Sequence, residues 1–220
     1  SPVASVLLST NMFTLIDEDA IAPIDQFVKT DADKAWLKGF YPAFMANSQT
    51  DGKTWGVPFQ RSTVVMYYNK DLFREAGLDP NKAPQSWKEL SEAAQKLTKK
   101  DASGKVMQYG IQIPSTGFAY WMLQTLTTPN GVLLANETGT KVTFDHPKVI
   151  EALEYWVNLT NQAVHPAGVV AWGTTPMDFS EKNAAITVTT TRTLTTVRTN
   201  PPFAFGVGKI AGTLRKRSPT

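Results

Sequence analysis

The sequence predicts an α/β fold, because segments with the pattern of strands alternate along the chain with segments with the pattern of helices. Residues 64–68, with the sequence VVMYY, have the β-branched and aromatic composition of a buried strand. Residues 87–100 follow with apolar side chains on one helix face, and strand patterns return at residues 107–113, 186–188 and 203–210. Hydrophobic residues make up 42% of the chain, which is enough to build a core and argues against disorder.

The first part of the chain predicts short elements. Residues 3–8 form an apolar strand and residues 11–17 form a helix. Residues 33–44 carry apolar and aromatic side chains at helical spacing, interrupted by Pro42, which removes a backbone donor. Residues 51–53, with the sequence DGK, are a hairpin turn signal.

The middle of the chain contains two helices with clear end signals. Residues 71–76 form a short helix that ends at Gly77, because a helix C-terminus favours a residue that tolerates positive φ. Ser86 and Glu89 have the spacing of a capping box at the start of the helix over residues 87–100.

Two further helices are predicted from their first residues. Residues 115–117, with the sequence STG, begin one of them. Asp145 or His146 caps the other, and Pro147 occupies its first position, where proline is favoured. The apolar side chains that we expect to point inward from this second helix are Val149, Ile150, Leu153, Trp156 and Val157.

Charge and cysteine content exclude several classes of protein. The net charge is only +3, and the one basic cluster, at residues 215–217, is interpreted as a solvated tail, so we predict no nucleic-acid partner. The absence of cysteine excludes disulfides, zinc–thiolate sites and thiol nucleophiles. No apolar run approaches the ~20 residues of a membrane span.

The sequence shows no pattern typical of catalysis. Its two histidines, His146 and His165, are interpreted as a helix cap and a loop residue, and no G-x-S-x-G motif accompanies them. Residues 52–54, with the sequence GKT, lack the upstream glycine of a phosphate-binding loop. No pair of carboxylates has the pattern that glycoside hydrolysis needs. We therefore predict a protein that is not an enzyme and that has no cofactor and no metal.

Hydroxyl and aromatic side chains gather at the ends of the predicted elements. Ser9 ends one strand, Ser62 precedes a second and Thr190 follows a third. Phe118 and Trp121 lie at the start of a helix, after a small polar loop. Hydroxyl groups and flat apolar faces are what sugars and polyols require of a binding cleft. From the residues alone, a core position for Trp121 and plain β-propensity for the threonines stay open as alternatives.

The segment from Trp55 to Trp87 resembles a known family. It reads WGVPFQRSTVVMYYNKDLFREAGLDPNKAPQSW. This order is similar to the first interdomain crossover of type 2 bacterial solute-binding proteins, the receptor subunits of ABC importers. Residues 181–186 resemble another element of that family, with Asn183 at a glycine position, where we expect a left-handed conformation. The resemblance implies a type 2 periplasmic-binding-protein-like fold, with two lobes joined by crossover strands, here incomplete.

The resemblance also implies how the chain is divided. Residues 1–62 correspond to a partial first lobe, residues 63–203 to the second lobe, and residues 204–220 to a return crossover and tail. Parts of the family fold would precede Ser1 and follow Thr220, so we expect a central fragment of a longer, monomeric protein. That protein is expected in the periplasm or outside the cell, free or lipid-anchored, and its signal peptide is not in this chain.

Within the family, the sequence is most similar to receptors for glycerol-3-phosphate and glycerophosphodiesters. The resemblance implies ligand contacts at Ser62, Phe118, Trp121 and Thr190, while a glutamate of those receptors falls on Ser9. It further implies capture of a small polar solute by hinge closure and delivery to a membrane permease. A sugar-binding receptor is the first alternative, followed by a carbohydrate-active enzyme and a protein-interaction module.

Overall fold

The computed structural model describes residues 4–136, 139–199, 203–210, 212 and 213. The basic cluster at residues 215–217 lies outside this range. The chain divides into two compact units, unit 1 (Ser1–Arg61) and unit 2 (Ser62–Thr220), and each has its own organisation. The lobe boundaries inferred from the sequence stay a prediction.

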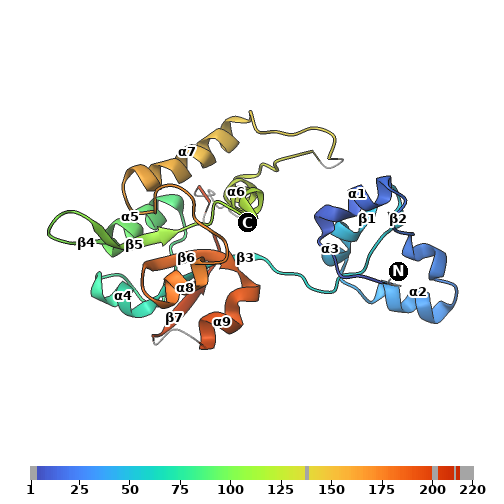
Figure 1. Ribbon diagram of the computed structural model, residues 1–220, viewed down its shortest axis with the longest axis horizontal. Helices are drawn as coiled ribbons and strands as arrows, with labels where there is room; N and C mark the ends of the chain where they lie inside the picture. Colours follow the sequence, from blue (N-terminus) through green and yellow to red (C-terminus); the bar gives the residue numbers. More distant parts are fainter. Residues whose placement is uncertain (1–3, 137–138, 200–202, 211, 214–220) are drawn as a thin grey trace, which may run out of the picture. The chain divides into compact units, whose positions relative to one another are not determined.

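Unit 1 consists of short elements held by local signals (Figure 1). Its helices and strands are η1 (Ser9–Asn11), α1 (Met12–Asp17), η2 (Ile24–Phe27), α2 (Asp31–Lys38), α3 (Pro42–Met45), η3 (Ala46–Ser48), β1 (Gln49–Thr50) and β2 (Lys53–Thr54). Thr30 and Asp33 form a complete capping box at the start of α2. Asp51 and Gly52 have φ of 51° and 71°, as a tight hairpin between β1 and β2 requires.

The prediction of a strand over residues 3–8 is wrong for the part that the structure describes, residues 4–8. These residues belong to no strand, and Val6, Leu7 and Leu8 are exposed. A strand exists only through pairing, and no described segment pairs with this one. The predicted helix over residues 33–44 is two helices, because α2 ends before Gly39 and Pro42 starts α3.

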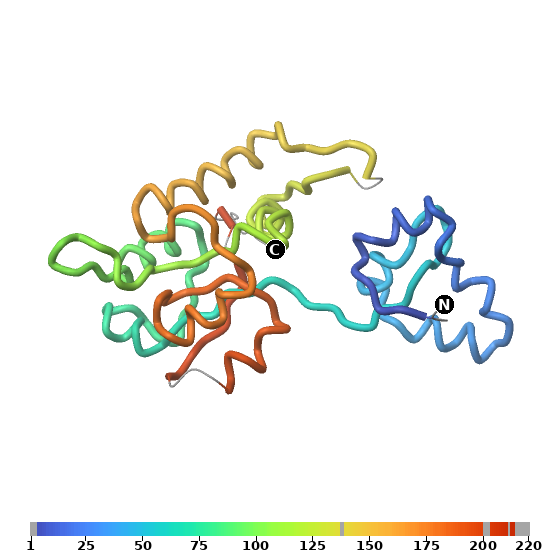
Figure 2. The backbone as a smooth tube through the Cα atoms, in the orientation of Figure 1, coloured from blue at the N-terminus to red at the C-terminus, as the bar shows by residue number. Residues whose placement is uncertain are grey.

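Unit 2 contains a five-stranded sheet in the order β4-β5-β6-β3-β7. The strands are β3 (Val64–Asn69), β4 (Lys99–Lys100), β5 (Val106–Gln112), β6 (Ala184–Thr190) and β7 (Phe205–Gly208). Among the described strands, β5 and β6 are parallel neighbours, whereas β4 is antiparallel to β5, and β3 is antiparallel to β6 and to β7. Figure 2 shows this arrangement, with the cyan β3 lying between segments from the orange and red end of the chain.

Helices cover both faces of the sheet in unit 2. They are α4 (Lys70–Glu75), α5 (Trp87–Leu97), α6 (Ala119–Thr127), η4 (Thr128–Asn130), α7 (Pro147–Asn161), α8 (Thr175–Ser180), η5 (Thr191–Thr193) and α9 (Leu194–Thr199). Met66 points toward the larger core, which α5, α6 and α7 complete. Tyr67 points to the opposite face, where it packs with Phe179 of α8 and Val197 of α9. This alternation is the period of two expected of a strand buried on both faces.

The helix predicted over residues 87–100 ends at Leu97, and Lys99–Lys100 pairs with β5 as strand β4. Its capping box is half formed: Ser86 accepts a hydrogen bond from the backbone of Glu89, but the Glu89 carboxylate accepts from Gln85. The expected left-handed residue is also displaced by one position, because Lys182 rather than Asn183 has positive φ.

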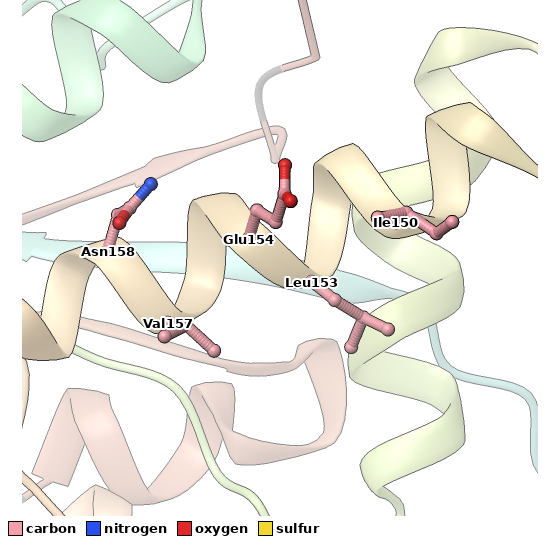
Figure 3. A pocket seen from close by; sticks show the side chains of 5 residues that line it. All are labelled: Ile150, Leu153, Glu154, Val157 and Asn158. Carbon is pink, nitrogen blue, oxygen red and sulfur yellow. The ribbon is translucent and has the colours of Figure 1, made fainter.

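Helix α7 begins as predicted, and Val149 and Trp156 point inward as expected, but the other three predicted side chains do not. His146 Nδ1 accepts from the backbone N–H of Lys148, and Pro147 is the first helical residue. The fully buried residues are Val149, Ala152 and Leu159. Ile150, Leu153 and Val157, predicted to point inward, are 44%, 41% and 56% exposed, because they lie beside this buried stripe and not on it. Figure 3 shows these three side chains on α7.

Candidate functional site

The sheet topology brings several predicted site residues to one edge of unit 2. Because β5 and β6 are parallel, their carboxyl ends lie at the same edge. The antiparallel strand β3 starts at that edge, with Val64 opposite Thr190. Ser62 therefore lies two residues before the start of β3, close to the point where β6 ends.

Hydrogen bonds hold the two chain segments together at this point. The backbone N–H of Thr191 donates to the carbonyl of Thr63 over 3.0 Å, and the backbone N–H of Thr63 donates to Thr191 Oγ1 over 3.3 Å. Thr190 is only 2% exposed, and its carbonyl accepts from the Tyr67 hydroxyl. Ser62 is half-buried, so of these two predicted residues it is the more accessible.

Phe118 and Trp121 belong to a cluster of aromatic rings at the start of α6. Phe118 is the N-cap of this helix, which follows the loop at the carboxyl end of β5 and contacts β3 (Figure 1). The Trp121 ring is stacked on that of Trp172, with centroids 6.3 Å apart and planes at 9°. Phe118 meets Trp172 edge-on at 5.1 Å. Both geometries are favourable for aromatic pairs.

Trp172, which comes from the loop before α8, was not predicted from the sequence as a site residue. Two hydrogen bonds join this loop to the one before α6: Ser115 N–H donates to the Val170 carbonyl, and Val170 N–H donates to Ser115 Oγ, both over 2.9 Å. Gly117 has φ of 77°, and a Cβ there would lie 3.2 Å from Trp172 Cβ. The sequence feature that could have indicated this residue is a single tryptophan between two small residues, Ala171 and Gly173.

His165, predicted to be a loop residue, is a buried anchor for the end of β5. Its Nε2 lies 3.0 Å from the backbone nitrogen of Ile113 and 3.1 Å from the carbonyl oxygen of the same residue, and its Nδ1 lies 2.7 Å from the Pro166 carbonyl oxygen. Burial lowers the pKa of His165 below its ordinary value. The neutral ring thus fixes the backbone from which the loop carrying Phe118 departs.

Ser9 belongs to a different unit from the other predicted residues. It is the first residue of η1 in unit 1 and is half-buried, whereas Ser62, Phe118, Trp121 and Thr190 all belong to unit 2. Each unit also has a surface hollow that contains no predicted site residue. One, of about 370 Å³, is lined by α7 alone (Figure 3), and the other, of about 320 Å³, lies in unit 1 around Tyr41 and Phe59.

The described residues offer no evident metal site. Within that part of the chain, no three His, Cys, Asp or Glu side chains gather in a way that could hold a metal ion. Among the same residues, none of the helices combines the length and the apolar character needed to span a bilayer.

An α/β unit with hydroxyls and stacked aromatic rings at the carboxyl edge of its sheet has the form of a ligand-binding lobe. The chain belongs to the family of bacterial extracellular solute-binding proteins, whose sequence profile matches residues 2–216. This finding confirms the family predicted from the Trp55–Trp87 segment.

The chain is also similar in sequence to individual curated proteins. The chain is 28% identical over 202 residues to the sn-glycerol-3-phosphate-binding periplasmic protein UgpB of Yersinia enterocolitica, covering 89% of this chain and 44% of that protein. It is 36% identical over 107 residues to UgpB of Brucella abortus, covering 47% of this chain and 25% of that protein. The chain thus spans less than half the length of these curated relatives.

Solved structures confirm the α/β solute-binding fold. UgpB from Mycobacterium tuberculosis, in complex with glycerophosphocholine, has a TM-score of 0.74 at 20% identity, covering 92% of this chain and 50% of that one. The substrate-binding protein Lmo0181 from Listeria monocytogenes, in complex with cycloalternan, has a TM-score of 0.70 at 27% identity, covering 93% and 51%.

Proposed function

We propose that the protein is the substrate-binding receptor of an ABC importer and that its solute is a glycerol phosphate or a glycerophosphodiester. The observation that supports it most is the carboxyl edge of the sheet in unit 2. There the start of β3, just after Ser62, lies opposite Thr190, and Phe118 and Trp121 form an edge-on pair at the start of α6. The named ligands of the UgpB relatives support this solute class.

The chemistry of the edge suits a small polar solute. A glycerol backbone presents hydroxyls that Ser62 can meet and C–H groups that can lie against the face of an indole such as Trp121. We propose that unit 2 supplies one wall of a cleft, that the other wall comes from the first lobe, and that the cleft closes by hinge motion. The solute is released unchanged to a membrane permease.

A sugar is the second candidate solute. The relative from Listeria monocytogenes, at 27% identity, holds cycloalternan, so a carbohydrate is compatible with this fold at comparable similarity. Ser9 also stands where the resemblance to glycerol-3-phosphate receptors expects a glutamate. A neutral hydroxyl there favours a polyhydroxylated ligand as much as a phosphorylated one.

Calorimetric titration of the full-length natural protein with sn-glycerol-3-phosphate, glycerophosphocholine and mannobiose tests the proposal. We expect binding of a glycerol phosphate or phosphodiester, and we expect Trp121→Ala to weaken it about tenfold, since the solute would lose its aromatic face. Trp156→Ala is the matched control, because Trp156 is also half-buried against the main core but lies outside the aromatic cluster. Binding of none of the three compounds would contradict the proposal, and binding of mannobiose alone would select the sugar.

A further inference from the structure

Three aromatic rings from two separate segments form one cluster at the candidate site. Phe118 and Trp121 come from the start of α6, and Trp172 comes from the loop before α8. Trp172 contacts both of the others: its ring is parallel to Trp121 and perpendicular to Phe118. Phe118 and Trp121 are themselves edge-on at 6.2 Å, so each ring restrains the other two.

The backbone around Trp172 is fixed independently of its ring. The paired hydrogen bonds between Ser115 and Val170 lock the loop on one side. On the other side, the Thr175 hydroxyl donates to the Trp172 carbonyl over 3.0 Å, and Thr175 is fully buried. With its backbone fixed in this way and its ring in contact with Phe118 and Trp121, Trp172 can serve as a wall for its neighbours.

Trp121 is the ring that such a wall would orient. It is half-exposed near the N-terminus of α6, where an indole in contact with water can change rotamer. A parallel ring on one of its faces removes most of that freedom and leaves a defined plane. Ordering a side chain before the ligand arrives lowers the cost of binding.

We propose that Trp172 is a positioning residue of the solute site, which acts on the solute through Trp121 by fixing the plane of its indole. This inference rests on the proposed function and adds a residue to it. Trp172 need not touch the solute.

A double-mutant cycle on the full-length natural protein tests the inference. The variants are Trp172→Ala, Trp121→Ala and the combination, with Trp172→Phe as the conservative variant and Trp156→Ala as the control. Binding of sn-glycerol-3-phosphate, glycerophosphocholine and mannobiose is measured by calorimetry, and stacking of the two indoles is followed by near-UV circular dichroism without ligand. Thermal unfolding identifies any variant that does not fold.

We expect Trp172→Ala to weaken binding about fivefold in the natural background and to have no further effect when Trp121 is already alanine. Trp172→Phe should restore most of the loss, since it keeps a flat ring. The two single alanine variants should remove the same near-UV signal. If Trp172→Ala does not fold, Trp172→Phe takes its place in the cycle. Trp172→Phe should weaken binding by a smaller factor, and it should have no effect on binding when Trp121 is already alanine.

Three results would overturn the inference. Unchanged binding by Trp172→Ala would show that the stack does not matter, while leaving the proposed function intact. If Trp172→Ala weakened binding by the same factor in the natural protein and in the Trp121→Ala variant, Trp172 would act independently of Trp121. Failure of the natural protein to bind any of the three compounds would remove the proposed function and this inference together.

Discussion

Units 1 and 2 of the same chain owe their structure to different interactions. In unit 2, two clusters of buried apolar side chains include residues of the five-stranded sheet, and a third lies among α5, α6 and α7. In unit 1, the described residues contribute to none of these clusters, and large apolar side chains such as Phe27, Tyr41 and Phe59 are exposed. Its helices are specified by local devices, such as the capping box of Thr30 and Asp33. Caps and turns can thus define elements where few apolar side chains are buried, but burial supplies most of the stability of a fold.

The largest expected effect comes from removing one phenylalanine ring from each unit. Phe179→Ala in unit 2 should lower the free energy of unfolding by about 3–5 kcal/mol, because Phe179 is 0% exposed and its loss leaves a cavity. Phe27→Ala in unit 1 should change it by less than about 0.5 kcal/mol, because Phe27 is 68% exposed. Urea unfolding of the 220-residue chain measures both. Equal losses would mean that unit 1 has a core comparable to that of unit 2.

A smaller difference is expected for two glycine-to-alanine changes. A Cβ at Gly110 in β5 would lie 1.9 Å from the Ala94 carbonyl oxygen of α5, so Gly110→Ala should cost about 1–3 kcal/mol of unfolding free energy. The matched change in unit 1 is Gly56→Ala, where the new Cβ meets nothing within 4 Å. It should be neutral or slightly stabilising. Thermal unfolding of both variants checks the pair, and a destabilised Gly56→Ala would reveal packing in unit 1.

The smallest effect should appear in the pH dependence. Burial lowers the pKa of His165 below its ordinary value of 6.5, so the stability that it contributes to unit 2 is complete above pH 6.5 and is lost as the pH falls below that value. In unit 1, hydrogen bonds from the backbone and then the side chain of Thr30 lower the pKa of Asp33. The stability that Asp33 contributes is therefore complete above its ordinary pKa of 3.8 and is lost only as the pH falls below that value.

Residue-resolved NMR during urea titrations at several pH values separates the two units. His165→Gln should reduce the change of unfolding free energy with pH in unit 2 near pH 6, and it should leave the stability of unit 1 unchanged. The same pH dependence in the variant would show that another group is responsible.

The elements predicted correctly from the sequence are those whose signals are local. The run over residues 64–68 is strand β3, and His146 with Pro147 starts α7, because composition and cap chemistry decide both. The errors concern interactions across the chain. Lys99 joins a strand because β5 passes close to α5, and only the neighbours of α7 decide that Ile150 is left exposed.

The same distinction applies to the candidate site. Ser62 and Thr190 could be placed at one sheet edge once the order of the strands was known, and the family resemblance supplied their expected role. Trp172 could not be paired with Trp121 from the sequence, because the contact depends on a loop that Ser115 and Val170 hold in place. Whether these residues contact a solute stays a prediction.

The position of β3 in the sheet has a mechanical consequence. It is the strand that the chain enters at Ser62, and it is paired along its length with β6 on one side and along most of it with β7 on the other. A tension applied along β3 at this entry loads both rows of hydrogen bonds in shear, so that they must break together rather than one at a time. The chain thus enters unit 2 through a strand that hydrogen bonds hold on both sides.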